Sequence, residues 1–121
     1  MRVAIFSDVH GNLTGLEAVL ADIETQRPDL VIFAGDLCLM GPRPAECLRR
    51  VRALRLPAVM GNTDEWTAGA GAPPERMGDM LRWMRSQLTD DERAWLGGLP
   101  FGLTVSPTAD PANDLRIVHA N

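Results

Sequence analysis

The sequence predicts an α/β fold in which β-α-β units build a mostly parallel sheet. Three short apolar runs end at Phe6, Ala34 and Met60, and one stretch with helical spacing separates each run from the next. Strands that alternate with single helices are typical of right-handed crossovers between parallel strands. With 121 residues and 45% hydrophobic content, residues 1–121 fit one domain.

The first half of the chain carries clear start and stop signals for these elements. Asn12 is a good helix N-cap, and a helix from there ends at Arg27-Pro28. The apolar run 30–34 predicts the second strand, and Pro44 predicts the first turn of a helix that continues to Leu54. Residues 57–60 are predicted as the third strand.

The second half predicts a loop, two helices and two short strands. The small, breaker-rich residues 67–73 predict a mobile loop that could act as a lid. Helical signals cover 74–88 and return after Thr89, which has capping-box spacing to a glutamate. Residues 101–105 and 115–119 are predicted as strands.

Charge and hydropathy exclude several classes of protein. The formal net charge of −4 argues against a general nucleic-acid or membrane-surface binder. The sequence shows no signal region and no apolar stretch long enough to span a bilayer, so we expect a cytoplasmic location and no membrane partner. Cys38 and Cys47 are expected to be reduced, partly buried thiols.

Residues of types that commonly bind metal ions follow each of the three predicted strands. Asp8 and His10 are two positions apart, so they project to the same side of an extended chain, while Asp36 and Asn62 follow the next two strands. Because ligands bind at the carboxyl ends of strands in open α/β sheets, these side chains are expected to converge. Alternatively, each could serve only as a turn or capping residue.

A carboxylate at Asp36 can bridge two divalent cations, which holds them about 3.5–4 Å apart for phosphoryl chemistry. Oxygen and imidazole donors together suit Mn²⁺, Fe or Zn²⁺.

The motifs Asp8-x-His10, Gly35-Asp36 and Gly61-Asn62, in this order and spacing, resemble the calcineurin-like metallophosphoesterases. The small bacterial and archaeal phosphodiesterase branch is the most similar. The resemblance implies the first half of that family's α/β/β/α sandwich and a site for two divalent metal ions. It assigns one ion to Asp8, His10 and Asp36. It assigns the other ion to Asp36, Asn62 and His119, which follows the strand predicted at 115–119.

Thr63 and Asp64 are the candidate catalytic residues. The family often has a histidine at the position of Thr63, where it assists the leaving group; threonine can donate a hydrogen bond there but cannot exchange a proton near neutral pH. Asp64 would orient a ligand histidine. The alternative for Asp64 is a solvated loop carboxylate.

The Gly-His-x-His motif that gives the family two further imidazoles is not found in this sequence. The resemblance therefore implies a C-terminally truncated domain, completed by a second copy or by a complementing C-terminal chain. An unpaired strand at 115–119 would also favour such association.

Two functions stay open. The first is a metal-dependent phosphoesterase, in which a metal-bound hydroxide hydrolyses a small phosphodiester or a nucleotide. The alternative is a non-catalytic remnant or interaction domain with weak metal binding or none.

Overall fold

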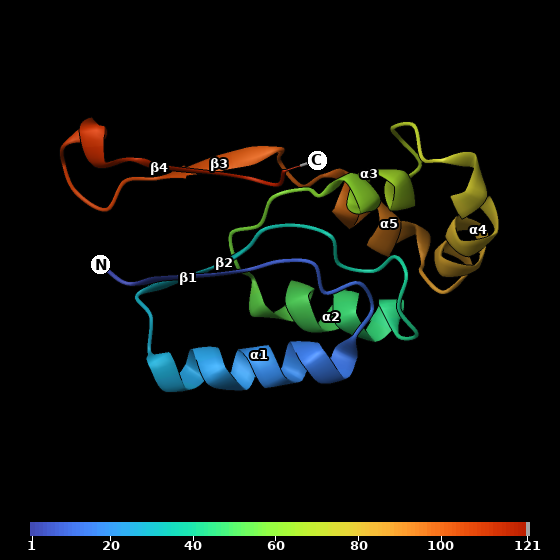
Figure 1. Ribbon diagram of the computed structural model, residues 1–121, viewed down its shortest axis with the longest axis horizontal. Coiled ribbons are helices and arrows are strands. Elements are labelled where there is room, and N and C mark those ends of the chain that lie inside the picture. Colours follow the sequence, from blue (N-terminus) through green and yellow to red (C-terminus); the bar gives the residue numbers. More distant parts are fainter. Residues whose placement is uncertain (121) are drawn as a thin grey trace.

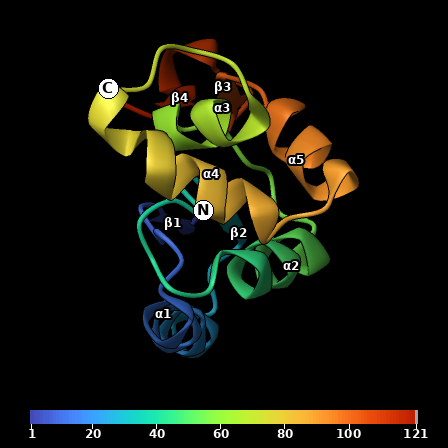
Figure 2. The same ribbon diagram turned by 90° about the vertical axis from the view of Figure 1, so that its right-hand side faces the viewer.

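The computed structural model describes residues 1–120, which form layers around a parallel pair of strands. In chain order the elements are β1 (Val3–Phe6), α1 (Leu13–Gln26), β2 (Leu30–Phe33), α2 (Pro44–Leu54), α3 (Asn62–Ala68), the 3₁₀ turn η1 (Glu75–Met77), α4 (Gly78–Ser86), α5 (Asp90–Gly97), β3 (Gly102–Val105), the 3₁₀ turn η2 (Pro111–Asn113) and β4 (Leu115–Val118). Helices α1 and α2 lie on one side of β1 and β2, and the β3–β4 hairpin lies on the other (Figures 1 and 2). This arrangement confirms the predicted α/β class and the parallel β-α-β unit.

Each side of the β1–β2 pair has its own apolar core, because successive strand residues point to opposite faces. Phe33 packs in the larger core with α1, α2, α4 and α5, and its ring lies 5.4 Å from that of Phe6. Ile32, the preceding residue, is also fully buried but packs in the smaller core with Val59 and Ile117. The strands are thus held from both sides.

The helices predicted in the first half are confirmed. The Asn12 side chain accepts a hydrogen bond from the Gly15 N–H and caps α1, as its residue type predicts. Pro44 occupies the first turn of α2. Both helices end in a left-handed arginine, Arg27 with φ 48° and Arg55 with φ 52°.

The prediction of a regular third strand at residues 57–60 was wrong. Only Ala58 forms a parallel bridge, with Phe33. Pro57 has no N–H to donate to β2, and the Gly61 N–H, the next one after Val59 that would face β2, donates instead to Asp64 Oδ2 at 2.9 Å. The segment therefore runs beside β2 without becoming a strand.

The second half differs from the prediction in its turns. The expected loop at 67–73 begins later, because α3 continues to Ala68 and ends at Gly69 with φ 100°. The helical stretch predicted at 74–88 is divided into η1 and α4. The capping box of α5 is confirmed: the Thr89 hydroxyl accepts from the Glu92 N–H at 3.1 Å, and the Glu92 carboxylate accepts from the Thr89 N–H at 2.9 Å.

The strands predicted at the end of the chain are confirmed, but the second is not unpaired. β4 pairs antiparallel with β3, with Leu103 opposite Ile117. Ile117 is buried in the smaller core, while Val118 keeps 54% of its surface exposed. The hairpin thus satisfies one edge of β4, and the unpaired-strand argument for association does not hold.

Cys38 and Cys47 are both free and buried, as expected. Burial raises the pKa of the Cys47 thiol to about 11 and raises that of Cys38 well above its ordinary value. Within residues 1–120, none of the helices is both long and apolar enough to cross a membrane.

Helices α2 and α5 are joined by ion pairs. Arg49 donates to the Glu92 carboxylate at 2.6 Å, and Arg52 donates to Asp91 at 2.7 Å while its guanidinium lies 5.9 Å from the centre of the Trp95 ring. Burial alone would raise the pKa of Glu92, but the hydrogen bonds from Arg49 and Thr89 outweigh it, so the pKa is lowered. Ionised Glu92 therefore stabilises the folded state.

Glu92→Gln is expected to lower the free energy of unfolding by about 1 kcal/mol at pH 7, because glutamine keeps the shape but loses the charge-assisted bond. The folded-state pKa lies below the unfolded value, so the wild-type advantage is complete above the unfolded pKa, about 4.3 for glutamate. It disappears as the pH falls through the folded pKa. Urea unfolding of both proteins from pH 7 to pH 3 measures this difference in the free energy of unfolding. Glu75→Gln, at an exposed glutamate in η1, is the matched control, and a pH-independent difference would contradict the prediction.

Candidate functional site

The candidate site is built on two loops that continue the pairing of β1 and β2 beyond the strands. The Asp8 N–H donates to the Gly35 carbonyl at 2.9 Å, and the His10 N–H donates to the Asp36 carbonyl at 3.1 Å. Asp8, His10 and Asp36 all have left-handed backbone conformations, with φ of 57°, 47° and 65°. Residues other than glycine rarely adopt the left-handed conformation, and those that do are concentrated at functional sites.

Three of the predicted ligands form one compact group. His10 Nε2 lies 3.4 Å from Asp8 Oδ1 and 3.6 Å from Asp36 Oδ2, and one ligand atom from each residue lies within 4.8 Å of the other two. Two atoms that bind the same ion at 2.0–2.2 Å are about 3–3.5 Å apart at ordinary coordination angles. The group is therefore close to the size that a single divalent cation requires.

The other predicted ligands meet near the same carboxylate oxygen. His119 Nε2 lies 3.5 Å from Asp36 Oδ2 and 3.2 Å from Asn62 Oδ1. Asp36 Oδ2 thus has two imidazole nitrogens near it, one from His10 and one from His119. The structure brings together all five residues predicted as metal ligands, although they come from four separate segments of the chain.

Both imidazole rings are held by backbone carbonyls. His10 Nδ1 lies 2.9 Å from the Leu39 carbonyl oxygen, and His119 Nδ1 lies 2.7 Å from that of Ala34. A carbonyl accepts, so each Nδ1 is assigned a proton, and Nε2 is the ring nitrogen that is left to bind a metal ion. This second hydrogen bond is typical of histidines that bind metals.

Two glycines allow the loops to approach this closely. A Cβ on Gly61 would lie 2.1 Å from Asp36 Oδ1, and one on Gly35 would lie 2.8 Å from His119 Nδ1. Gly35 also has φ 96°. The motif spacing indicates the glycines but not these contacts, because the two segments that meet are remote in sequence.

The surroundings of Asp64 fit neither of the two predicted alternatives, orientation of a ligand histidine or a solvated loop carboxylate. It is fully buried, and its carboxylate accepts the N–H groups of Asp36, Leu37 and Gly61 at 2.8–2.9 Å. Among the described residues it makes no hydrogen bond to a histidine, so it does not orient a ligand ring, nor is it solvated. Burial raises the pKa of its carboxyl group, although the three amide bonds oppose that shift.

Thr63 contacts the site through its backbone. Its N–H donates to Asp36 Oδ1 at 3.1 Å, which leaves Asp36 Oδ2 free of that bond. Its side chain is buried, and the hydroxyl has no hydrogen-bond partner within residues 1–120. The contact of Thr63 with Asp36 is therefore made by its backbone and not by the hydroxyl on which the prediction rests.

The donor set fits metal ions. Asp8 and Asp36 offer carboxylate oxygens, Asn62 an amide oxygen, and His10 and His119 an imidazole nitrogen each. Carboxylate and imidazole donors suit Mn²⁺, Fe and Zn²⁺, and no thiolate lies among these ligands. The arrangement can hold a divalent cation at Asp8, His10 and Asp36.

Comparison with known proteins places this site in a family. The family model described as "Calcineurin-like phosphoesterase superfamily domain" matches residues 1–120. The chain is 30% identical, over 102 residues, to the "Uncharacterized protein MJ0912" of Methanocaldococcus jannaschii; the match covers 82% of this chain and 42% of that protein.

Solved structures agree with this. A metallophosphoesterase from Sphaerobacter thermophilus is 36% identical, with a TM-score of 0.69, and the match covers 85% of this chain and 43% of that one. A structure described as a putative diadenosine tetraphosphatase is 25% identical, with a TM-score of 0.74, over 99% of this chain and 50% of that one. The chain thus spans about half the length of these relatives. It belongs to the calcineurin-like phosphoesterase superfamily.

Proposed function

We propose that this chain carries the metal centre of a metal-dependent phosphoesterase that holds two divalent cations. The observation that carries the proposal is the position of Asp36 Oδ2, 3.6 Å from His10 Nε2 and 3.5 Å from His119 Nε2. A carboxylate oxygen this close to two imidazole nitrogens is placed to serve as a ligand that two cations share. Two divalent cations, when bound, polarise a phosphate ester and lower the pKa of water.

The chain's own residues have separate roles in this proposal. Asp8 and His10 hold one cation and Asn62 and His119 hold the other, with Asp36 shared. Each cation then has three protein ligands, which leaves positions open for substrate and water, as is usual in catalytic metal sites. Small phosphodiesters or nucleotides are the proposed substrates.

Thr63 is the proposed contact to the leaving group. Its hydroxyl has no hydrogen-bond partner among the described residues but is buried, so in this proposal the contact forms only when substrate binding uncovers it. A threonine hydroxyl cannot protonate a leaving group at neutral pH. We therefore expect esters with good leaving groups, such as aryl phosphodiesters or phosphoanhydrides, to be the better substrates.

The second candidate function is an interaction domain of the same fold that binds metal without turnover. The observation that favours it concerns the histidines. This sequence has two, and both are already used in the proposed site, so no further imidazole of this sequence is available to the cations. A second copy or a complementing chain is the proposed source of further groups.

The metal centre is tested with Asp36→Asn. An amide cannot bridge two cations as a carboxylate does, so we expect the affinity for Mn²⁺ to fall by at least about 100-fold. The wild-type chain should bind two Mn²⁺ ions by calorimetric titration and hydrolyse bis-p-nitrophenyl phosphate. Asp79→Asn, at a carboxylate that is 95% exposed, is the control. Mn²⁺ binding without turnover would favour the interaction domain, and equal binding by the mutant would contradict the site itself.

Asp64→Asn should destabilise the protein rather than remove a catalytic group. Asparagine has one acceptor oxygen where aspartate offers two, so its NH₂ group would face backbone N–H donors in a buried place. We expect the free energy of unfolding to fall by about 2–3 kcal/mol. Asp8→Asn, at a side chain that is 56% exposed, should change it far less. An Asp64→Asn protein with native stability and no activity would show instead that Asp64 acts in the reaction.

Completion of the site by a second copy predicts a concentration dependence. Specific activity toward bis-p-nitrophenyl phosphate should rise with protein concentration and level off once the dimer dominates. Light scattering on the same samples reports the mass. A specific activity that stays constant while the mass remains that of one chain would contradict completion by a second copy.

A further inference from the structure

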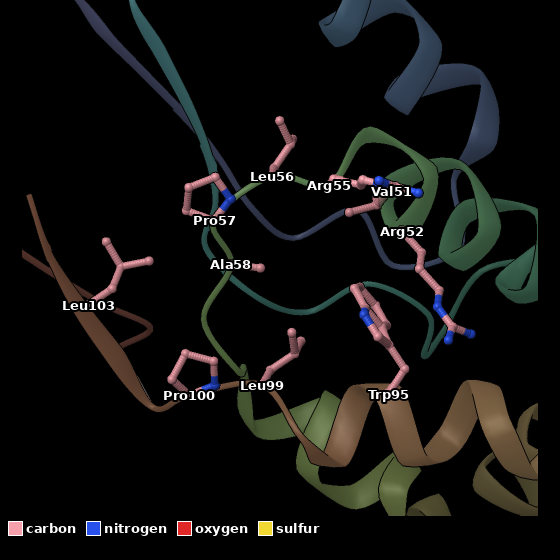
Figure 3. Close-up of a pocket in the computed structure, with 10 residues that line it drawn as sticks. All are labelled: Val51, Arg52, Arg55, Leu56, Pro57, Ala58, Trp95, Leu99, Pro100 and Leu103. Carbon is pink, nitrogen blue, oxygen red and sulfur yellow. The ribbon is translucent and has the colours of Figure 1, made fainter.

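A second candidate site lies in a pocket of about 580 Å³ that contains none of the proposed metal ligands. The chain there passes from the end of α2 through Pro57 and Ala58, and the far wall is formed by α5, the segment after it and β3. Figure 3 shows Ala58 between Leu103 on one side and the Trp95 ring on the other, with Leu99 facing it. Pockets of about 300–1,000 Å³ with mostly apolar walls are typical of ligand sites.

A free backbone edge lies in this pocket. The Phe33 N–H donates to the Pro57 carbonyl, and the Val59 N–H donates to the Phe33 carbonyl, both at 3.0 Å. In a parallel ladder with this pattern, the N–H and C=O of the residue between them point away from the neighbouring strand. That residue is Ala58, which is buried, and its backbone groups have no hydrogen-bond partner within residues 1–120. Buried backbone groups are rarely left without a partner.

The charge at the pocket has one sign. Arg52 and Arg55 line it, and no aspartate or glutamate does, although the chain as a whole has a net charge of −4. Arg52 already pairs with Asp91 and stacks on Trp95. Arg55 is exposed and has no ion pair among the described residues. The pocket thus offers one available cation beside apolar walls.

From these features we infer that the pocket binds an extended apolar peptide segment that carries a C-terminal carboxylate. The peptide backbone pairs with the N–H and C=O of Ala58, an apolar side chain fills the space between Trp95 and Leu103, and the carboxylate pairs with Arg55. Addition of a peptide to an exposed strand edge, with pockets for its side chains, is an established mode of recognition. A single free residue limits the pairing to a short segment, because the next N–H on this edge, that of Met60, already donates to the Pro100 carbonyl.

The test uses the full chain and the peptide acetyl-Val-Val-Leu with a free C-terminal carboxylate. In ¹⁵N-detected NMR titrations we expect the Ala58 amide and the Trp95 indole signals to shift together, with a dissociation constant in about the millimolar range. The same peptide with an amidated C-terminus or an N-methylated central peptide bond should bind more weakly. A peptide with an internal glutamate and an amidated end should bind as weakly as the amidated peptide, and binding as tight as that of the acid peptide would contradict recognition of a C-terminal carboxylate.

The chain offers a matched pair of variants. Arg55 and Arg27 each end a helix in the left-handed conformation, but only Arg55 lines the pocket. Arg55→Gln should weaken the acid peptide about two- to fivefold, the effect of one exposed ion pair, and Arg27→Gln should have no effect. Equal effects of both variants, shifts confined to other residues, or octanoate binding as tightly as the peptide would each overturn the inference. Octanoate provides an apolar chain and a carboxylate but no amide.

Discussion

The buried carboxylate of Asp64 is the contact on which the rest of the site depends. It lies at the start of α3 and accepts the N–H groups of Asp36 and Leu37, which follow β2, and of Gly61, which precedes its own helix. One side chain therefore fixes the loop that carries Asp36 against the helix that begins with Asn62. A buried carboxylate is costly unless several donors satisfy it, and here three backbone amides do so. The contacts of Asp64 itself are all with backbone amides, although it directly follows Thr63, whose N–H donates to Asp36.

The close approach of these loops also requires unusual backbone. Asp8, His10 and Asp36 all lie in the left-handed region, where ordinary side chains are disfavoured by about 1–3 kcal/mol each. The cost is met by the surrounding bonds, since the loop amides continue the β1–β2 ladder past the strands. Glycine at positions 35 and 61 removes the atoms that would otherwise separate the segments. The proposed metal ligands are thus positioned by the fold itself, which would favour binding because little further ordering is needed.

The sequence was informative where a local rule decides the structure. The N-cap at Asn12, the capping box at Thr89 and the ligand motifs after the strands are all local signals, and the structure contains each of them where expected. The errors arose where a side chain competes for a backbone group: Asp64 takes the N–H of Gly61, which would otherwise face β2, so the third strand is reduced to a bridge. The place of Asp64 was missed for the same reason, because its partners include amides 27 and 28 residues away. Every residue except proline has the same backbone donor and acceptor, so residue types do not show which of these groups will pair.

The hydrogen bonds that orient the two histidines close loops of very different length. The His10 contact to Leu39 spans 29 residues, whereas the His119 contact to Ala34 spans 85. The entropy of loop closure makes the longer connection costlier by about 1 kcal/mol. His119 is moreover held by a two-stranded hairpin that packs on the smaller of the two cores. Local opening of that hairpin would release His119 while Asp8, His10 and Asp36 stay together, so the two halves of the centre have unequal local stability.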